Sequence, residues 1–340
     1  MCGIVGLFVG CTALSYCPKQ LLAGTPAAAP DGAAGYRSPF RNWHERASVR
    51  QAPRRVLADD EGDRHYFSPD LVAIAQHPLV KELPPACFEE VLVQHLYRYL
   101  EFTARLEYLV VNRTVLGIAR GSIGVHLPEE MRFDAYKMYC DEAYHTLFSV
   151  DLSRQVRQRT GIVPKETGEP YFLVRLQQIL AELPAGDRAL AEVLFVIVSE
   201  TLISASLAEV PERADVVAAV RSTVRDHASD EGRHHAYFAT FLRHLWGQLS
   251  PRERRTAGLL VPRLVDAFLR PDLPAIRLEL AGYGLSAADA EQVAAETYTP
   301  GIIGAHLAAT SRQTVHYFQS LGAFDDPAAL DELRRYGMVA

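Results

Sequence analysis

The order Glu-x-x-His occurs twice in this chain, as Glu142–His145 and as Glu231–His234. Each pair lies within a long stretch that contains no proline. A spacing of three residues places the carboxylate and the imidazole on the same face of a helix, close enough to bind one ion. A single pair of this kind is common on solvated helices. Two pairs justify a search for further metal ligands.

An acidic residue precedes each pair on a separate apolar helix, Glu107 in "TARLEYLV" and Glu200 in "FVIVSETLIS". One glutamate from each of two helices, with Glu-x-x-His from each of two others, is the di-iron or di-manganese carboxylate pattern of ferritin-like four-helix bundles. In an antiparallel hairpin, residues equidistant from the turn lie at the same height. The midpoint between Glu107 and Glu142 falls in the "GSIGVHLP" loop, and the midpoint between Glu200 and Glu231 falls in the "VPERAD" break. Each acid is therefore expected at the same height as its partner glutamate. The spacing therefore favours a metal centre.

Glu200 follows the apolar run "AEVLFVIV" and has no cation within one helical turn. An unpaired buried carboxylate is very costly, and a metal ion would supply the missing partner. In the alternative interpretation, Ser199 or Thr201 faces inward and Glu200 reaches water, as most glutamates do. The symmetric spacing favours the metal.

Two choices stay open on residue pattern alone. Glu101 satisfies the turn symmetry with Glu142 as well as Glu107 does, so the pattern favours Glu107 only mildly. His227 stands on one helical stripe with Glu231 and His234, at i, i+4 and i+7. It is either a third histidine ligand or a core histidine bonded to a neighbouring carboxylate. Asp230 and His235 fall on other faces of the helix, and we interpret them either as surface residues or as groups that support the ligands from behind.

The elements that would carry these residues are helices. From Ser68 onward, apolar residues recur at three- and four-residue spacing, and no alternating pattern is long enough to predict a strand. "SPDLVAIA" predicts a helix with Ser68 as N-cap and Pro69 at its first position. We predict an all-α protein, a ferritin-like four-helix bundle with additional flanking helices. The predicted bundle helices are 88–111, 129–156, 187–210 and 213–249, and the predicted flanking helices are 169–183, 255–269, 286–298 and 302–321.

The domain organisation is predicted as a flexible leader over 1–35 and a single helical domain over 36–340, whose first part, 36–66, is an irregular arm. A net charge of -6 gives no attraction to nucleic acid or to an anionic membrane. No segment reaches the roughly 18 apolar residues of a membrane-spanning helix. Five cysteines without repeated spacing indicate reduced thiols and a cytoplasmic protein.

Together these residues resemble the p-aminobenzoate N-oxygenase family, non-haem di-iron enzymes of antibiotic pathways that oxidise amines to hydroxylamine, nitroso or nitro products. The resemblance rests on the "H-x-x-x-E-x-x-H" order over 227–234, on the upstream acids and on "RNWHERASVR", which looks like the N-terminal arm of the family. It extends over most of the chain. The resemblance implies seven metal ligands: Glu107, Glu142, His145, Glu200, His227, Glu231 and His234. It thus selects Glu107 over Glu101 and makes His227 a ligand.

The resemblance further implies two iron ions, O2 as co-substrate, an external electron donor and a homodimer. The substrate would be a small-molecule or carrier-bound amine. An oxygen-rich ligand set with several imidazoles suits iron or manganese better than zinc. Candidate residues of the substrate pocket lie one or two turns from the ligands, although they would fit a plain core equally well. They are Tyr99, Phe102, Thr103 and Ile203.

The sequence also offers alternatives to this function. "MCGIVGLF" at the N-terminus resembles class II glutamine amidotransferases, whose Cys2 would become an N-terminal nucleophile, but the strands of that fold are missing from the pattern. Within the predicted fold, a di-iron hydroxylase or desaturase acting on carbon is the alternative enzyme. A metal-storage protein is the alternative without turnover, and the length of the chain argues against it.

Overall fold

The computed structural model describes residues 36–165 and 168–339. The predicted leader over 1–35, including "MCGIVGLF", lies outside the described residues. The described part is helical, and its only β-pairing is an isolated bridge between His65 and Val216. None of its helices is both long enough and apolar enough to cross a membrane. The prediction of an all-α protein is confirmed.

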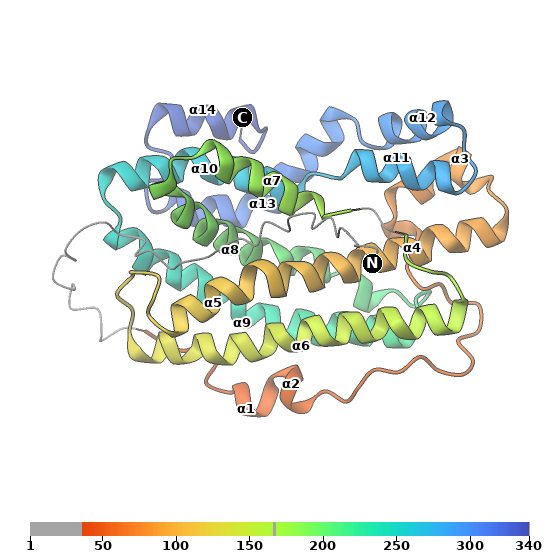
Figure 1. Cartoon of the computed structure of the whole chain (residues 1–340), viewed down its shortest axis with the longest axis horizontal. Helices are drawn as coiled ribbons and strands as arrows, with labels where there is room; N and C mark the ends of the chain where they lie inside the picture. The colour runs from red at the N-terminus through yellow and green to blue at the C-terminus, as the bar shows by residue number, and fades with distance from the viewer. Residues whose placement is uncertain (1–35, 166–167, 340) are drawn as a thin grey trace, which may run out of the picture.

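Four long helical segments form the central bundle (Figure 1). The first is one continuous run that consists of α4 (Pro85–Leu106), a π-helical turn (Glu107–Val111) and α5 (Asn112–Ala119). It packs against α6 (Glu129–Thr160), and α8 (Ala185–Leu207) packs against α9 (Ala218–Gln248). The two hairpins predicted from the turn symmetry are therefore present.

Shorter helices flank the bundle. α10 packs against α7, α8, α13 and α14, and α11 packs against α12 (Figure 1). α10 begins with a capping box, in which the Ser250 side chain accepts from the Glu253 backbone N–H and the Glu253 carboxylate accepts from that of Ser250. The flanking helices are α7 (Tyr171–Glu182), α10 (Pro251–Leu269), α11 (Leu273–Gly282), α12 (Ala287–Thr297), α13 (Pro300–Gln319) and α14 (Pro327–Arg335).

The predicted α-helix at Ser68 is wrong. The chain forms two 3-10 turns there, Pro69–Leu71 and Ala73–Gln76, followed by the short α3 (Pro78–Lys81). Ser68 does not cap a helix, because its hydroxyl donates to Asp215 Oδ2 at 2.7 Å. A tertiary contact has replaced the local one that the sequence suggested.

Residues 36–66, the N-terminal arm, contain only the short helices α1 (Trp43–Arg46) and α2 (Ser48–Gln51). The arm runs along α6 on the outside of the bundle (Figure 1), and α2 contacts both α6 and α9. Its apolar side chains Phe40, Trp43 and Ala47 are buried. The arm is thus packed against the two helices that carry the Glu-x-x-His pairs.

Candidate metal centre

All seven predicted ligands converge in the middle of the bundle, and all are buried. We call these residues the cluster. The π-helical turn carries Glu107, α6 carries Glu142 and His145, α8 carries Glu200, and α9 carries His227, Glu231 and His234.

One half of the cluster lies around His227. Its Nε2 is 3.1 Å from Glu231 Oε1 and 3.8 Å from Glu107 Oε1. Together with His145, these side chains offer four ligand atoms within 4.8 Å of one another. His227 therefore points into the cluster with a free ring nitrogen, which is the orientation a ligand needs.

The other half lies around His234. Its Nδ1 is 2.8 Å from Glu142 Oε1 and 3.2 Å from Glu231 Oε1. His145 Nδ1 is 2.8 Å from Glu142 Oε2 and 3.4 Å from Glu231 Oε1. Glu231 and His145 belong to both halves, and Glu200 joins through a third group with Glu107 and Glu142. The arrangement offers two adjacent ion positions that share a carboxylate.

The cluster has unsatisfied buried atoms that a metal would satisfy. Neither carboxylate oxygen of Glu107, Glu200 or Glu231 has a hydrogen-bond partner, and neither do His227 Nε2 and His234 Nδ1. Each such atom is costly without a partner. Four carboxylates would carry four negative charges, which two divalent cations balance. The donor set therefore fits two divalent ions.

The pKa values of the carboxyl groups diverge within the cluster. Burial, together with the charges of neighbouring glutamates, raises the pKa of Glu107 and of Glu200 well above the usual range. Burial acts in the same direction on Glu231, but the imidazoles of His234 and His227 lower its pKa well below that range. The nearby carboxylates also raise the pKa of His145 to about 10, against the effect of burial. A cation that enters the cluster must displace these protons.

Burial favours Glu107 over Glu101 as the ligand from this helical segment. Glu107 is fully buried in the cluster, whereas the Glu101 side chain is 40% exposed and pairs with Arg105. Glu107 begins the π-helical turn. Such wide turns are rare and are frequent at functional sites, because the extra residue changes the direction of the side chains around it. The turn could not be read from the residue pattern.

Two aspartates lie directly behind the predicted ligands. Asp141 and Asp230 are fully buried, so Asp230 is not a surface residue but fits the other predicted role, a group that supports the ligands from behind. Each binds a histidine from the opposite pair: Asp141 Oδ2 lies 3.2 Å from His234 Nε2, and Asp230 Oδ2 lies 3.1 Å from His145 Nε2. A carboxylate on the far ring nitrogen orients a ligating histidine and increases its basicity. His235, in contrast, is half-buried and contacts Tyr317 at 2.8 Å.

The N-terminal arm holds both aspartates. Trp43 Nε1 donates to Asp141 Oδ1 at 2.8 Å. Ser48 donates to Asp230 from its backbone N–H, at 3.2 Å, and from its hydroxyl. The arm therefore acts on both Glu-x-x-His pairs through one carboxylate each. A sequence signal existed, because an aspartate directly precedes each pair as Asp141-Glu142 and Asp230-Glu231.

We expect Trp43→Phe and Ser48→Ala each to weaken iron binding by about 10- to 100-fold, the range typical of groups that orient metal ligands. Both changes keep the bulk of the side chain but remove a donor to an aspartate. Competition with a chelator would measure the affinity, and thermal unfolding of the metal-free proteins would check folding. Trp246→Phe is the matched control, because Trp246 lies twelve residues beyond His234 on α9, about 18 Å along the axis. Unchanged iron affinity in both variants would show that the arm only packs against the bundle and does not affect metal binding.

Two cavities are lined by different helices of the bundle. The first, of about 280 Å³, lies beside α4 and is largely aromatic. Its wall includes Phe102, Phe172, Phe268 and Tyr298, together with His95 and Arg98. Arg98 forms an ion pair with Glu279, and Arg270 in the same wall donates to Asp266 Oδ1 at 2.8 Å. Both cations are therefore already neutralised within the chain.

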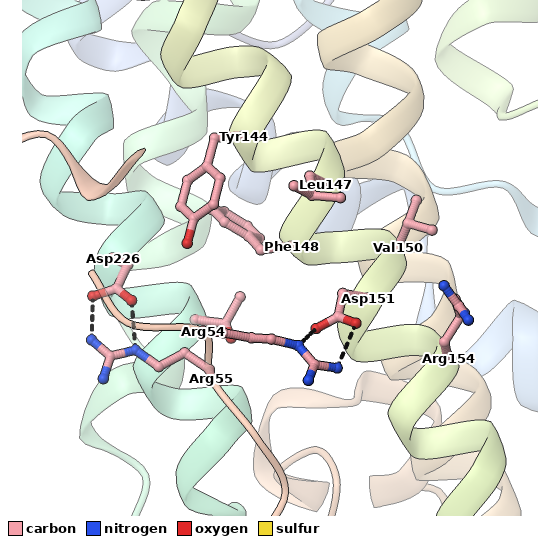
Figure 2. A pocket seen from close by; sticks show the side chains of 10 residues that line it. Arg54, Arg55, Tyr144, Leu147, Phe148, Val150, Asp151, Arg154 and Asp226 are labelled. Carbon is pink, nitrogen blue, oxygen red and sulfur yellow. Dashed lines mark hydrogen bonds and ion pairs between the residues drawn. The ribbon is translucent and has the colours of Figure 1, made fainter. Parts of the chain in front are cut away.

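The second cavity, of about 290 Å³, lies on the outer side of α6 and α9 (Figure 2). The arm closes one edge of it, where Arg54 pairs with Asp151 and Arg55 pairs with Asp226 (Figure 2). Phe148 lies in its wall, and the centre of the Phe148 ring is 5.3 Å from that of His145 and 5.7 Å from that of His227. One aromatic ring separates this cavity from two predicted ligands.

Comparison with known proteins shows which family this chain resembles. The family model of the p-aminobenzoate N-oxygenase AurF matches residues 36–321. A 4-aminobenzoate N-oxygenase from Streptomyces thioluteus is 26% identical over 257 residues, which cover 73% of this chain and 75% of that protein. The family match begins with the N-terminal arm and includes every residue of the cluster.

Proposed function

The chain belongs to the p-aminobenzoate N-oxygenase family, and on this premise we propose that it is a di-iron, O2-dependent N-oxygenase. It oxidises an amine to a hydroxylamine, nitroso or nitro product in the biosynthesis of a specialised, antibiotic-type metabolite. The observation that carries this proposal is the buried cluster of four glutamates and three histidines with unpartnered ligand atoms. Membership of the family makes the protein an oxygenase; the metal, its number and the biosynthetic context are proposals.

The residues that would hold the iron ions are the seven of the cluster. An oxygen-rich set with imidazoles suits iron or manganese, and two such ions activate O2 after reduction by an external donor. The chain supplies the position of the ligands, through Asp141 and Asp230, and it excludes water, because every ligand is buried. The third histidine, His227, occupies a place that carboxylate-rich bundles of this type leave without a histidine.

We propose the aromatic cavity beside α4 as the approach for the amine. Phe102 lies in its wall, and Tyr99, one turn earlier on α4, has a buried hydroxyl without a partner among the described residues. Burial and, to a lesser degree, the charge of Glu231 raise the pKa of Tyr99, so its hydroxyl stays protonated. Tyr99 is not among the residues that line the cavity, so its predicted role in the substrate pocket is untested. Aromatic walls and neutralised arginines favour an aromatic amine.

Other expectations stay predictions. Thr103 and Ile203 are buried, and no contact places them in the cavity wall, so their role in the pocket is untested. An external electron donor, a homodimer and a cytoplasmic location also stay predictions from the sequence and its resemblance.

The proposal is tested by adding ferrous iron, a reductant and 18O2 to the purified protein with a panel of amines. The panel contains 4-aminobenzoate, the compound in the name of the S. thioluteus relative. It also contains amino acids, and anilines that lack a carboxylate. We expect at least one aromatic amine to give a product whose nitrogen carries labelled oxygen, as measured by mass spectrometry. Zinc-loaded protein is the control.

Each other outcome has a defined meaning. Labelled oxygen on carbon, or a new double bond, would replace the proposal by a hydroxylase or desaturase. Iron uptake without any oxidised product across the panel would contradict turnover and favour a metal-binding protein.

A further inference from the structure

The wall of the aromatic cavity beside α4 restricts the kind of molecule that the cavity can hold. Phe102 packs edge-on against Phe172 and Phe268, with ring centres 4.8 and 5.5 Å apart, and Tyr171 and Tyr298 also line the cavity. Its volume of about 280 Å³ lies at the lower end of the range for small-molecule sites, roughly 300–1,000 Å³. The cavity therefore suits a small ligand built on an aromatic ring.

The two arginines in this wall are paired with acids that lie behind it. Arg98 forms an ion pair with Glu279, whose side chain is 2% exposed. Arg270 forms an ion pair with Asp266 at 2.6 Å, and the Asp266 side chain is 1% exposed. Neither acid lines the cavity. Because each of these buried acids depends on its arginine for charge balance, neither arginine offers an unbalanced positive charge to a ligand.

The wall also carries negative charge of its own, because Glu101 and Asp272 line it. Glu101 pairs with Arg105 at 3.0 Å. Asp272 caps α11, where its carboxylate accepts the backbone N–H of Ala275 at 3.0 Å. A carboxylate on a ligand would thus meet further acids and no unbalanced cation among the described residues of the wall. Burying a charge without a partner is very costly.

His95 provides this wall with a neutral hydrogen-bond donor. Burial, together with the charge of Arg98, lowers the pKa of His95 to about 3, so the ring is uncharged at neutral pH. Its Nδ1 lies 3.2 Å from Arg98 Nη2 and must accept there, because a guanidinium can only donate. The single proton of the neutral ring is therefore on Nε2. No described residue accepts from Nε2, so it can donate to a ligand in the cavity.

We propose that the aromatic cavity binds an aromatic amine that lacks a carboxylate and carries a neutral oxygen as the acceptor for His95. An amide, an ester or a ketone on the ring would meet this requirement. The aromatic side chains pack against the ring of the ligand, and the balanced charges of the wall select against an anion. That this ligand is also the amine that becomes oxidised rests on the proposed function.

Two probes of the same shape test the selection against charge. 4-Aminobenzamide and 4-aminobenzoate differ in whether the group opposite the amine is neutral or negative. Calorimetric titration of the full chain as purified, without reductant so that no turnover occurs, measures both affinities. We expect 4-aminobenzamide to bind at least about tenfold more tightly. Equal or tighter binding of 4-aminobenzoate, or no binding of either probe, would overturn the proposal.

This titration is independent of oxygenase activity. A protein that binds the amide but oxidises no amine would contradict the proposed function and leave the inferred ligand class standing. A protein that oxidises amines but prefers 4-aminobenzoate would do the reverse.

Variants of the wall charges show whether the cavity is the place of binding. Glu279→Gln removes the charge that balances Arg98, so we expect the preference for 4-aminobenzamide to fall by at least about tenfold. Asp272→Asn leaves no buried cation behind, and asparagine caps a helix as well as aspartate does. It should shift the preference in the same direction by about threefold. Asp187→Asn is the matched control, because Asp187 is buried and pairs with Arg252 outside the cavity. An unchanged preference in both wall variants would overturn the proposal.

His95→Phe tests the hydrogen bond to the neutral oxygen. Phenylalanine keeps a ring at this position but has no donor. We expect the affinity for 4-aminobenzamide to fall by about fivefold, the effect of one hydrogen bond. The affinity for 4-methylaniline, which has no oxygen, should be unchanged in the same titration. An equal loss for both probes would overturn the role of His95 as the donor.

Discussion

Glu200→Gln is expected to yield a folded protein that no longer holds two iron ions. Both Glu200 oxygens are buried without partners at the edge of the cluster, where they meet Glu107 and Glu142 as possible ligands. Glutamine has nearly the same shape but no charge, so two divalent ions would face three carboxylates in place of four. We expect iron content to fall below two ions per chain and the affinity to fall by more than about 100-fold, beyond the effect of orienting groups.

In the metal-free protein, Glu200→Gln should not lower the thermal stability. Burial and the charge of Glu231 raise the pKa of Glu200, so without metal the carboxyl group holds its proton and resembles glutamine. The metal-free variant should therefore unfold at the same temperature as the metal-free parent, or higher. Only the stabilisation on adding iron should be lost.

Elemental analysis and thermal unfolding with and without iron measure both effects. Glu192→Gln is the matched control, because Glu192 lies two turns earlier on the same helix and outside the cluster. Full iron loading of Glu200→Gln would contradict the assignment of Glu200 as a metal ligand.

His227→Ala is expected to remove N-oxygenation while leaving a folded protein. His227 Nε2 faces Glu231 and Glu107 but has no hydrogen-bond partner, as expected of a nitrogen that would bind a metal. Removing it should leave one ion position short of a nitrogen ligand, so we expect fewer than two irons per chain. Activity with an accepted amine should fall by more than about 100-fold.

His235→Ala is the matched control for this change, since His235 lies on the same helix, is half-buried and contacts Tyr317 instead of the cluster. Iron content by elemental analysis and the yield of labelled product by mass spectrometry are measured side by side. If His227→Ala kept both full iron and full activity, the set of seven ligands would be wrong. Retained iron with lost activity would keep His227 in the site but assign it to the substrate side.

The residue pattern alone was sufficient for the fold class, and it named most of the residues of the candidate site. Two Glu-x-x-His pairs with acids at matching heights predict four helices in two hairpins, because the rise per residue is the same on both arms. The structure has those hairpins, and Glu107, Glu142, Glu200 and Glu231 meet where the symmetry places them. Periodicity carries this information because it depends on local geometry. It did not separate Glu107 from Glu101, since both satisfy the same turn; burial separates them.

Tertiary structure decided which partner each polar group has. Ser68 reads as a helix cap, but its hydroxyl binds Asp215, far away in the sequence. The pattern left Asp230 either at the surface or behind the ligands; Ser48 and His145 bind it because the arm and α6 both pack on α9. Spacing along a helix states which residues share a face, whereas only the packing of distant segments determines what that face meets.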